Sequence, residues 1–174
     1  VRDAGALLVA AAGNNDGALK RPADCQGVMA VGAVTRTGLK ADYASFGTNV
    51  ALSAPGGSGG DGIYGADNAG TTTAGANTYG EKQGTSFSAP QAAGVASLML
   101  ARNPNLTPSA LITRMQAASR SWATVVAGGA ACGTAGAGEC RCTTTTCGAG
   151  LLDARVALEL ATGPAAIIER IGTV

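Results

Sequence analysis

Three stretches of the chain are apolar without interruption. They are residues 5–12 (GALLVAAA), 27–35 (GVMAVGAVT) and 49–53 (NVALS), and a glycine-containing segment follows each of them. A continuous apolar run of this length is typical of a strand that is buried on both faces, as in a parallel sheet. We therefore predict three parallel strands in the first third of the chain.

Helical signals follow the strands. Residues 89–102 have almost no polar face, which predicts a helix that is buried nearly all round. Thr107, followed by proline, predicts the N-cap of a second helix, and Asp153 predicts the N-cap of a third helix that runs to Ala161. Between strands and helices, residues 58–80 predict a loop with a hairpin around 71–73. Strands followed by packed helices predict an α/β fold with a doubly wound, mainly parallel sheet.

The charge of the chain narrows the classes of partner. Charged residues make up 13% of the sequence, about half of the usual ~25%, and the net charge is +1. This balance gives no electrostatic reason to expect nucleic acid or an acidic membrane as partner. The apolar runs are also far shorter than the roughly 20 residues of a membrane span. The sequence contains no histidine, so any imidazole chemistry must come from outside these 174 residues.

The five cysteines form a cluster and an outlier. Cys132, Cys140, Cys142 and Cys147 lie within sixteen residues, whereas Cys25 stands alone. None of the clustered pairs has the CxxC spacing of a structural zinc site, so two local disulfides in an oxidising compartment are favoured over zinc. Four cysteines allow three pairings, and the sequence does not choose among them. Cys25 is expected to pair outside this chain or to remain free.

The first candidate for chemistry is Ser86, in the segment GTSFSAP that enters the predicted buried helix. The first N–H groups of a helix have no acceptor within the helix, and the helix dipole places partial positive charge there. If the Ser86 oxygen attacked a carbonyl, these donors would stabilise the developing oxyanion. The alternative is that Ser86 is an ordinary N-cap.

The second candidate is Asn14, which follows the first predicted strand. Ligands of parallel sheets bind at the carboxyl ends of the strands. A side-chain amide at this place could donate a hydrogen bond to an oxyanion. The alternative is a turn asparagine that tolerates a left-handed backbone.

Taken together, these segments resemble a known family. The motifs LLVAAAGNN (7–15), GVMAVGAV (27–34), DYASFG (42–47), ALSAPGG (51–57) and GTSFSAP (84–90) followed by AGVA are similar to subtilisin-like serine proteases and occur in that family's order. The cysteine-bearing segment ending in CGAGLLDA resembles a secreted bacterial branch that carries disulfides. The resemblance covers residues 7–160. It implies that residues 1–162 are the C-terminal part of a catalytic domain, with a cysteine-bearing loop at 119–148 and a tail at 163–174.

The resemblance implies a role for each candidate residue. Ser86 would be the nucleophile of a secreted serine endopeptidase that acts through an acyl-enzyme, and Asn14 would donate to the oxyanion together with the Ser86 N–H. Ala11, Ala12 and Gly13 would line the pocket for the residue before the scissile bond. The family needs no cofactor for catalysis. It often binds structural calcium in loops, and residues 21–28 are the candidate cation site here.

Three departures from the family pattern matter. Gln91 stands where the family usually has histidine, and Phe87 stands where a small residue or methionine is usual. Both should affect packing more than chemistry. The catalytic Asp and His of the family precede the AAGN segment, and this chain contains neither. A serine without a base is a weak nucleophile.

The resemblance therefore implies a partner, an N-terminal segment or chain that carries the Asp and the His. The substrates would be proteins or peptides. One alternative is a non-catalytic, protease-like scaffold that binds peptides or proteins. Another is a structural surface protein without a site, which the two oxyanion-type segments in order disfavour.

Overall fold

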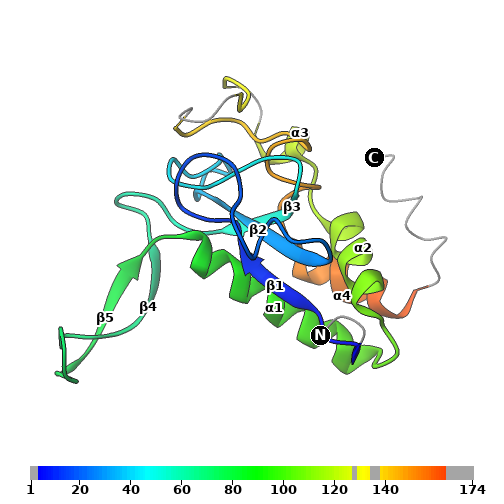
Figure 1. Cartoon of the computed structure of the whole chain (residues 1–174), viewed down its shortest axis with the longest axis horizontal. Coiled ribbons are helices and arrows are strands. Elements are labelled where there is room, and N and C mark those ends of the chain that lie inside the picture. The colour runs from blue at the N-terminus through cyan, green and yellow to red at the C-terminus, as the bar shows by residue number, and fades with distance from the viewer. Residues whose placement is uncertain (1–3, 127–128, 134–137, 164–174) are drawn as a thin grey trace.

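A parallel sheet of three strands lies at the centre of the molecule (Figure 1). The computed structural model describes residues 4–126, 129–133 and 138–163. In the sheet, β2 lies between β1 and β3, and both neighbours pair with it in parallel. The strands are β1 (Leu8–Ala11), β2 (Val28–Val34) and β3 (Val50–Pro55). The three predicted strands are thus confirmed.

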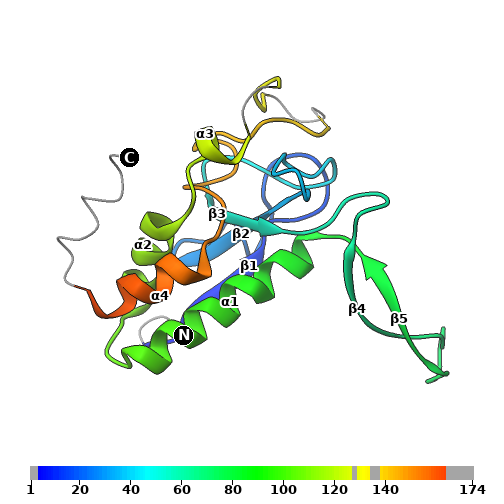
Figure 2. The same cartoon turned by 180° about the vertical axis from the view of Figure 1, so that it is seen from behind.

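Helices pack against one face of this sheet. They are α1 (Thr85–Arg102), α2 (Pro108–Ala118) and α4 (Ala154–Thr162). The four-residue α3 (Trp122–Val125) belongs to a separate cluster, in which Trp122 packs with Val34 at the end of β2. Helix α1 runs along all three strands, and α2 and α4 pack beside it (Figure 2). The predicted α/β fold with a mainly parallel sheet is confirmed.

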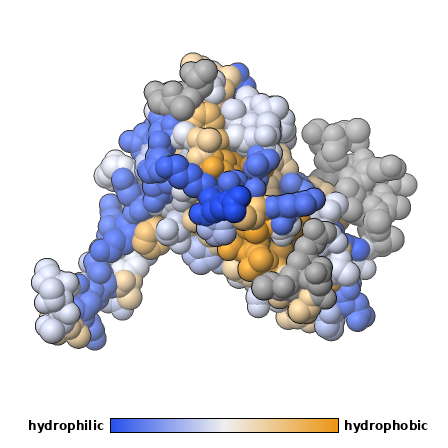
Figure 3. Space-filling view, in the orientation of Figure 1, coloured by the Kyte–Doolittle hydropathy of each residue, from blue (hydrophilic) through white to orange (hydrophobic). Residues whose placement is uncertain are grey.

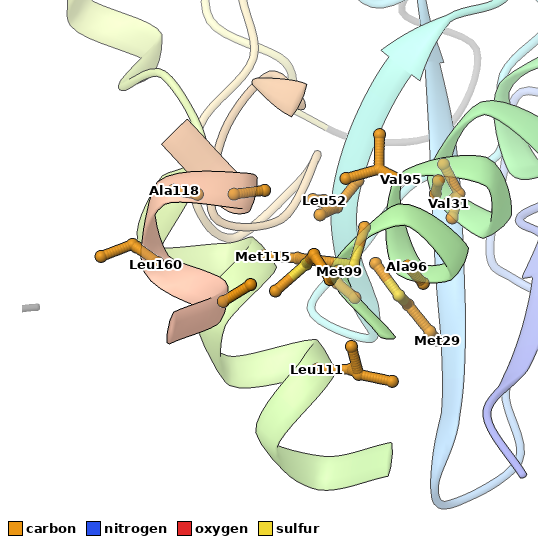
Figure 4. Close-up of a cluster of buried hydrophobic side chains, with 14 of the residues drawn as sticks. Met29, Val31, Leu52, Val95, Ala96, Met99, Leu111, Met115, Ala118 and Leu160 are labelled. Atoms are coloured by element: carbon orange, nitrogen blue, oxygen red, sulfur yellow. The ribbon is translucent and has the colours of Figure 1, made fainter. Parts of the chain in front are cut away.

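The core lies between the sheet and the helices. Met29, Val31 and Leu52 of the strands meet Val95 and Met99 of α1 in a buried cluster (Figure 4). Full burial of one such side chain stabilises the fold by about 1.5–3 kcal/mol. The cluster therefore fixes α1 against the first half and the middle of β2 and β3.

The predicted helix starts of α2 and α4 are correct. The hydroxyl of Thr107 accepts the N–H of Ala110 at 3.2 Å, and the carboxylate of Asp153 accepts the N–H of Val156 at 3.0 Å. Each contact satisfies one of the N–H groups that a helix start leaves without a partner.

The prediction that α1 is buried nearly all round is wrong. Leu98 is 52% exposed, and Ala93, Gly94 and Ser97 are exposed beside it. Within the described residues, the sheet and helices cover only one side of α1. Ala92 and Ala96 are buried, whereas Ala93 and Gly94, which made the sequence look apolar on every side, face outward.

A hairpin leaves the body of the molecule before α1. Strands β4 (Ile63–Asn68) and β5 (Asn77–Lys82) pair in antiparallel fashion, and the predicted hairpin position at 71–73 lies in the connection between them. Figures 1 and 2 both show this hairpin extending away from the sheet. Most of its side chains are exposed.

The four clustered cysteines form two disulfides, Cys132–Cys140 and Cys142–Cys147. The prediction of two local disulfides is confirmed, and all four sulfur atoms are bonded in pairs. Cys25 is exposed and has no disulfide partner among the residues described.

Trp122 anchors the cysteine-bearing segment, because its indole N–H donates to the carbonyl of Gly148 at 2.8 Å. Residues 127–128 and 134–137 of the predicted loop, and 164–174 of the predicted tail, lie outside the described residues. In the part of the chain that is described, no helix is long and apolar enough to span a membrane.

Candidate active site

The end of β1 lies directly beside the start of α1. Ala11 is the last residue of β1, and the N–H of Ala12 still donates to Val31 of β2 at 3.0 Å. The chain then turns at Gly13, whose φ is 115°, a region that favours glycine. A Cβ at Gly13 would also lie 2.9 Å from the Ser45 hydroxyl. This turn brings Asn14 to the carboxyl end of the sheet.

The side chain of Asn14 is held by Thr85, the first residue of α1. The Oδ1 atom of Asn14 accepts both the N–H of Thr85 at 3.0 Å and its hydroxyl at 2.8 Å. The Thr85 oxygen in turn accepts the N–H of Gly13 at 3.2 Å. Because Oδ1 is occupied by two donors, the NH2 group of Asn14 is the end left to donate. It lies beside Gly84, where an added Cβ would be 3.2 Å from Nδ2.

Ser86 lies in the first turn of α1 with its side chain exposed. The N-cap of α1 is Gly84, with a φ of 143° and no side-chain cap, so the N-cap interpretation of Ser86 is wrong. The Ser86 hydroxyl makes no hydrogen bond within the described part of the chain. A hydroxyl without a hydrogen-bond partner among the described residues is available to attack a carbonyl. The first-turn N–H of α1 and the Asn14 amide on the neighbouring loop can then donate to the oxyanion that forms on the attacked carbonyl oxygen.

Tyr43 ties the loop after β3 to the start of α1. Its hydroxyl accepts the N–H of Gly84 at 3.0 Å and lies 2.7 Å and 2.8 Å from the carbonyl oxygens of Gly56 and Gly57. Burial raises the pKa of the Tyr43 hydroxyl, the charge of Asp42 adds to this, and the Gly84 hydrogen bond opposes it. The hydroxyl therefore stays protonated at neutral pH and can donate to one of these carbonyls.

The departures Gln91 and Phe87 are packing residues. The side-chain amide of Gln91 donates to the carbonyls of Pro55 at 2.7 Å and Phe87 at 2.8 Å. These bonds fasten the first turns of α1 to the end of β3. Phe87 itself is half-buried.

Within the candidate cation site at 21–28, residues 23–28 line a pocket of about 330 Å³ together with Asn49. Asp24 is the one carboxylate among its lining residues. Calcium takes six to eight oxygen ligands, usually including several carboxylates. The only group of three or more His, Cys, Asp or Glu ligand atoms within the described ranges consists of the disulfide-bonded cysteines. A calcium ion in this pocket would therefore depend on Asp24, on the side-chain amide oxygens of Gln26 and Asn49 and on backbone carbonyls.

Sequence comparison places the chain among known proteins. The subtilase family (peptidase S8) matches residues 1–149. The extracellular protease of Xanthomonas campestris pv. campestris is 38% identical over 162 residues, which are 90% of this chain and 24% of that protein. Subtilisin DY of Bacillus licheniformis is 34% identical over 116 residues, which are 64% of this chain and 38% of that protein.

Structural comparison agrees. A protease from Pseudoalteromonas arctica superposes with a TM-score of 0.77 at 33% identity, covering 92% of this chain and 44% of that one. The chain thus spans about a quarter to two fifths of these two curated relatives and under half of this solved structure. The family match extends over most of the chain and contains both the Asn14 loop and the start of α1. This chain belongs to the subtilase family.

Proposed function

We propose that this chain is the serine-bearing part of an extracellular serine endopeptidase. The observation that carries the proposal is the Asn14 amide, which Thr85 turns so that its NH2 group faces the start of the helix that holds Ser86. The names of the relatives, an extracellular protease and a subtilisin, support the same function and do not favour a non-catalytic scaffold.

In the proposed reaction, each of these groups has one role. The Ser86 oxygen attacks the scissile carbonyl, and the carbonyl oxygen gains negative charge. The Asn14 NH2 group and the Ser86 N–H then donate to that oxygen, and this lowers the barrier because the donors are already in place. Collapse expels the amine and leaves an acyl group on Ser86, which water removes. Ala11, Ala12 and Gly13 form one wall of the pocket for the residue before the scissile bond.

A base must take the proton from Ser86, and these 174 residues contain no histidine. We infer that an N-terminal segment or separate chain supplies the Asp and His of the triad. Two observations support this. β1 pairs only with β2 among the described residues, so its outer edge is open, and an open parallel edge invites another strand. Apolar surface also gathers over β1 (Figure 3), where Leu8 is 42% exposed.

The two disulfides bear on the compartment in which the protein is found. Two disulfides form readily in oxidising compartments and rarely in the cytosol. This agrees with secretion, as does the name of the Xanthomonas relative. Subtilases need no cofactor for catalysis. A structural calcium ion at residues 23–28 would be held by Asp24 together with amide and backbone carbonyl oxygens.

The proposal is tested on the full-length protein with a casein substrate and a short chromogenic peptide. Ser86→Ala should abolish the hydrolysis of both substrates, since no acyl-enzyme can form. Ser97→Ala is the matched control, because Ser97 is an exposed serine of the same helix. Hydrolysis that survives Ser86→Ala, or that is lost equally in Ser97→Ala, would refute the assignment.

A further inference from the structure

Lys40 is a lysine in the interior of the protein. Its residue is 1% exposed, and it is one of the largest fully buried side chains in the described part of the chain. A buried ammonium is costly unless it is paired and hydrogen-bonded, so lysine is almost never found in such a place without partners. Nothing in the reaction proposed above uses this group.

The ammonium of Lys40 is surrounded by oxygen atoms. Its Nζ atom lies 2.7 Å from Asp16 Oδ1, 2.9 Å from the Ala41 carbonyl, 3.1 Å from that of Ala44 and 3.3 Å from that of Asp42. The ring of Phe46 covers it, with 5.0 Å from Nζ to the ring centroid. The group therefore has more acceptors than its three N–H donors, which is the environment that a bound cation would have.

Lys40 connects two loops. The carbonyl oxygens belong to the segment 41–44, whereas Asp16 belongs to the loop 13–17, two residues after Asn14. The ion pair between Lys40 and Asp16 is the charged link between these loops, and Asp16 is itself largely shielded, with a side-chain exposure of 21%.

Backbone hydrogen bonds join the same two loops. The N–H of Ser45 donates to Gly13 at 2.8 Å, the N–H of Asp16 to Tyr43 at 2.9 Å and the N–H of Phe46 to Gly17 at 2.9 Å. The N–H of Asn15 also reaches the Ser45 hydroxyl at 3.4 Å. The loop that carries Asn14 is thus fastened on both sides of Asn14 to a segment whose carbonyls converge on Lys40.

We propose that Lys40 is a positioning residue, an internal cation that keeps the loop 13–17 in the geometry in which Asn14 can donate to the oxyanion. The inference rests on the function proposed above. Without the ammonium, three carbonyl oxygens and a carboxylate would face one another in the interior without a donor, and like partial charges would push the two loops apart. A shift of the loop would move the Asn14 amide, which donates only in the transition state. The loss should therefore appear in kcat rather than in KM.

The test is a double-mutant cycle in the full-length enzyme, with kcat and KM measured on a chromogenic peptide. Lys40→Met keeps the length of the side chain and removes its charge. We expect it to lower kcat about 10-fold or more, with KM changed less than about 2-fold. In the Asn14→Leu background the same substitution should cost less than about 3-fold, because the donor that Lys40 positions is already gone.

Two further variants serve as a control and as an independent test of the positioning role of Lys40. Lys20→Met removes an exposed lysine and should leave kcat unchanged. Asp16→Asn weakens the same link while keeping the ammonium, so it should lower kcat in the same direction even if Lys40→Met does not fold. Equal losses of kcat from Lys40→Met with and without Asn14 would overturn the positioning role alone. A wild-type enzyme without activity, or an Asn14→Leu variant with full kcat, would overturn the proposed function and the role of Lys40 with it.

Discussion

Two segments approach the start of α1, and they are built in opposite ways. The loop 13–17 is fixed by Thr85, by the segment 43–46 and by a buried lysine. The hairpin β4–β5 instead exposes both faces, and its largest side chains, Tyr64 and Tyr79, are each 70% exposed. Their rings stack on one another at 5.9 Å rather than on the body of the protein.

The two segments differ in the number of hydrogen bonds and buried contacts that hold them to the body of the protein. A donor for an oxyanion contributes only if it is already in place when charge develops, so its loop must not move. None of the buried side-chain nitrogen or oxygen atoms in the described residues lacks a hydrogen-bond partner. A two-stranded hairpin in water is marginally stable by itself. We therefore expect the Asn14 loop to be rigid and the hairpin to open at low cost.

The largest effect is expected from removal of the Asn14 amide, the proposed oxyanion donor on the fixed loop. Asn14→Leu in the full-length enzyme should lower kcat by about 10²–10³ and leave KM nearly unchanged, a magnitude carried over from the loss of one such donor in subtilisin, a member of the same family. Asn14→Asp should be as harmful or worse, since a carboxylate repels the oxyanion. Steady-state kinetics on a peptide substrate measure this.

Asn15→Leu is the matched control, because Asn15 is an exposed neighbour whose backbone makes the contact to Ser45. Asn14 would return to the role of a turn residue if its variants lost activity only through KM or unfolding.

A smaller effect is expected from the residue that orients Asn14. Thr85→Val removes the hydroxyl that donates to Asn14 Oδ1 and accepts from Gly13, and it should lower kcat about 10-fold, as expected for the loss of one or two partly buried hydrogen bonds. Thr85→Ser keeps the hydroxyl and should retain most of kcat. Equal kcat values in the two variants would show that the hydroxyl does not set the orientation of the amide.

The pH dependence of stability offers a third test. Because burial raises the pKa of Tyr43 above that of an unfolded tyrosine, the fold holds the protonated form more tightly. Its contribution is fully present below the unfolded pKa of about 10 and is lost as the pH rises through the higher folded value. Tyr43→Phe cannot ionise, so its unfolding midpoint in urea should fall less between pH 9 and about 11 than that of the wild type. A parallel decline in both proteins would contradict this.

The smallest effect is expected in the hairpin. Tyr64→Ala removes the stacking partner of Tyr79, and we expect the melting temperature of the protein to change by less than about 1 °C because the pair is exposed. Amide hydrogen exchange in β4 and β5 should accelerate, while exchange in residues 13–17 stays slow. Slow exchange throughout the hairpin would show that it is as fixed as the Asn14 loop.

Much of the fold follows from local patterns. The three strands are long apolar runs, and the starts of α2 and α4 carry side chains that cap helices by themselves. The sequence predicts too large a buried surface for α1, because alanine and glycine occur on both buried and exposed sides of a helix. The pairing of the cysteines depends on how the chain returns to the sheet, so the sequence leaves three pairings open and the structure selects one.

The candidate site is also predicted only in part, because local patterns identify some of its residues and not their contacts. Ser86 and Asn14 stand at a helix start and a strand end, positions with a recognisable pattern. Thr85 lies next to Ser86, and Tyr43 lies within the motif DYASFG, so the sequence contains both without revealing their contacts. Lys40 gives no signal at all, because a lysine in a short polar loop is almost always exposed. Its burial depends on the fold of residues 13–17, which are far from it in sequence.

The most direct measurement is the site of covalent modification in the full-length protein. A fluorophosphonate probe reacts with an activated serine, and mass spectrometry of the digested adduct identifies which serine carries it. We predict a single adduct on Ser86, with a labelling rate that is about 10²–10³ lower after Asn14→Leu and with no label after Ser86→Ala. An adduct on another serine, or an equal yield of label at Ser86 in the denatured protein, would contradict the assignment of Ser86 as the activated nucleophile.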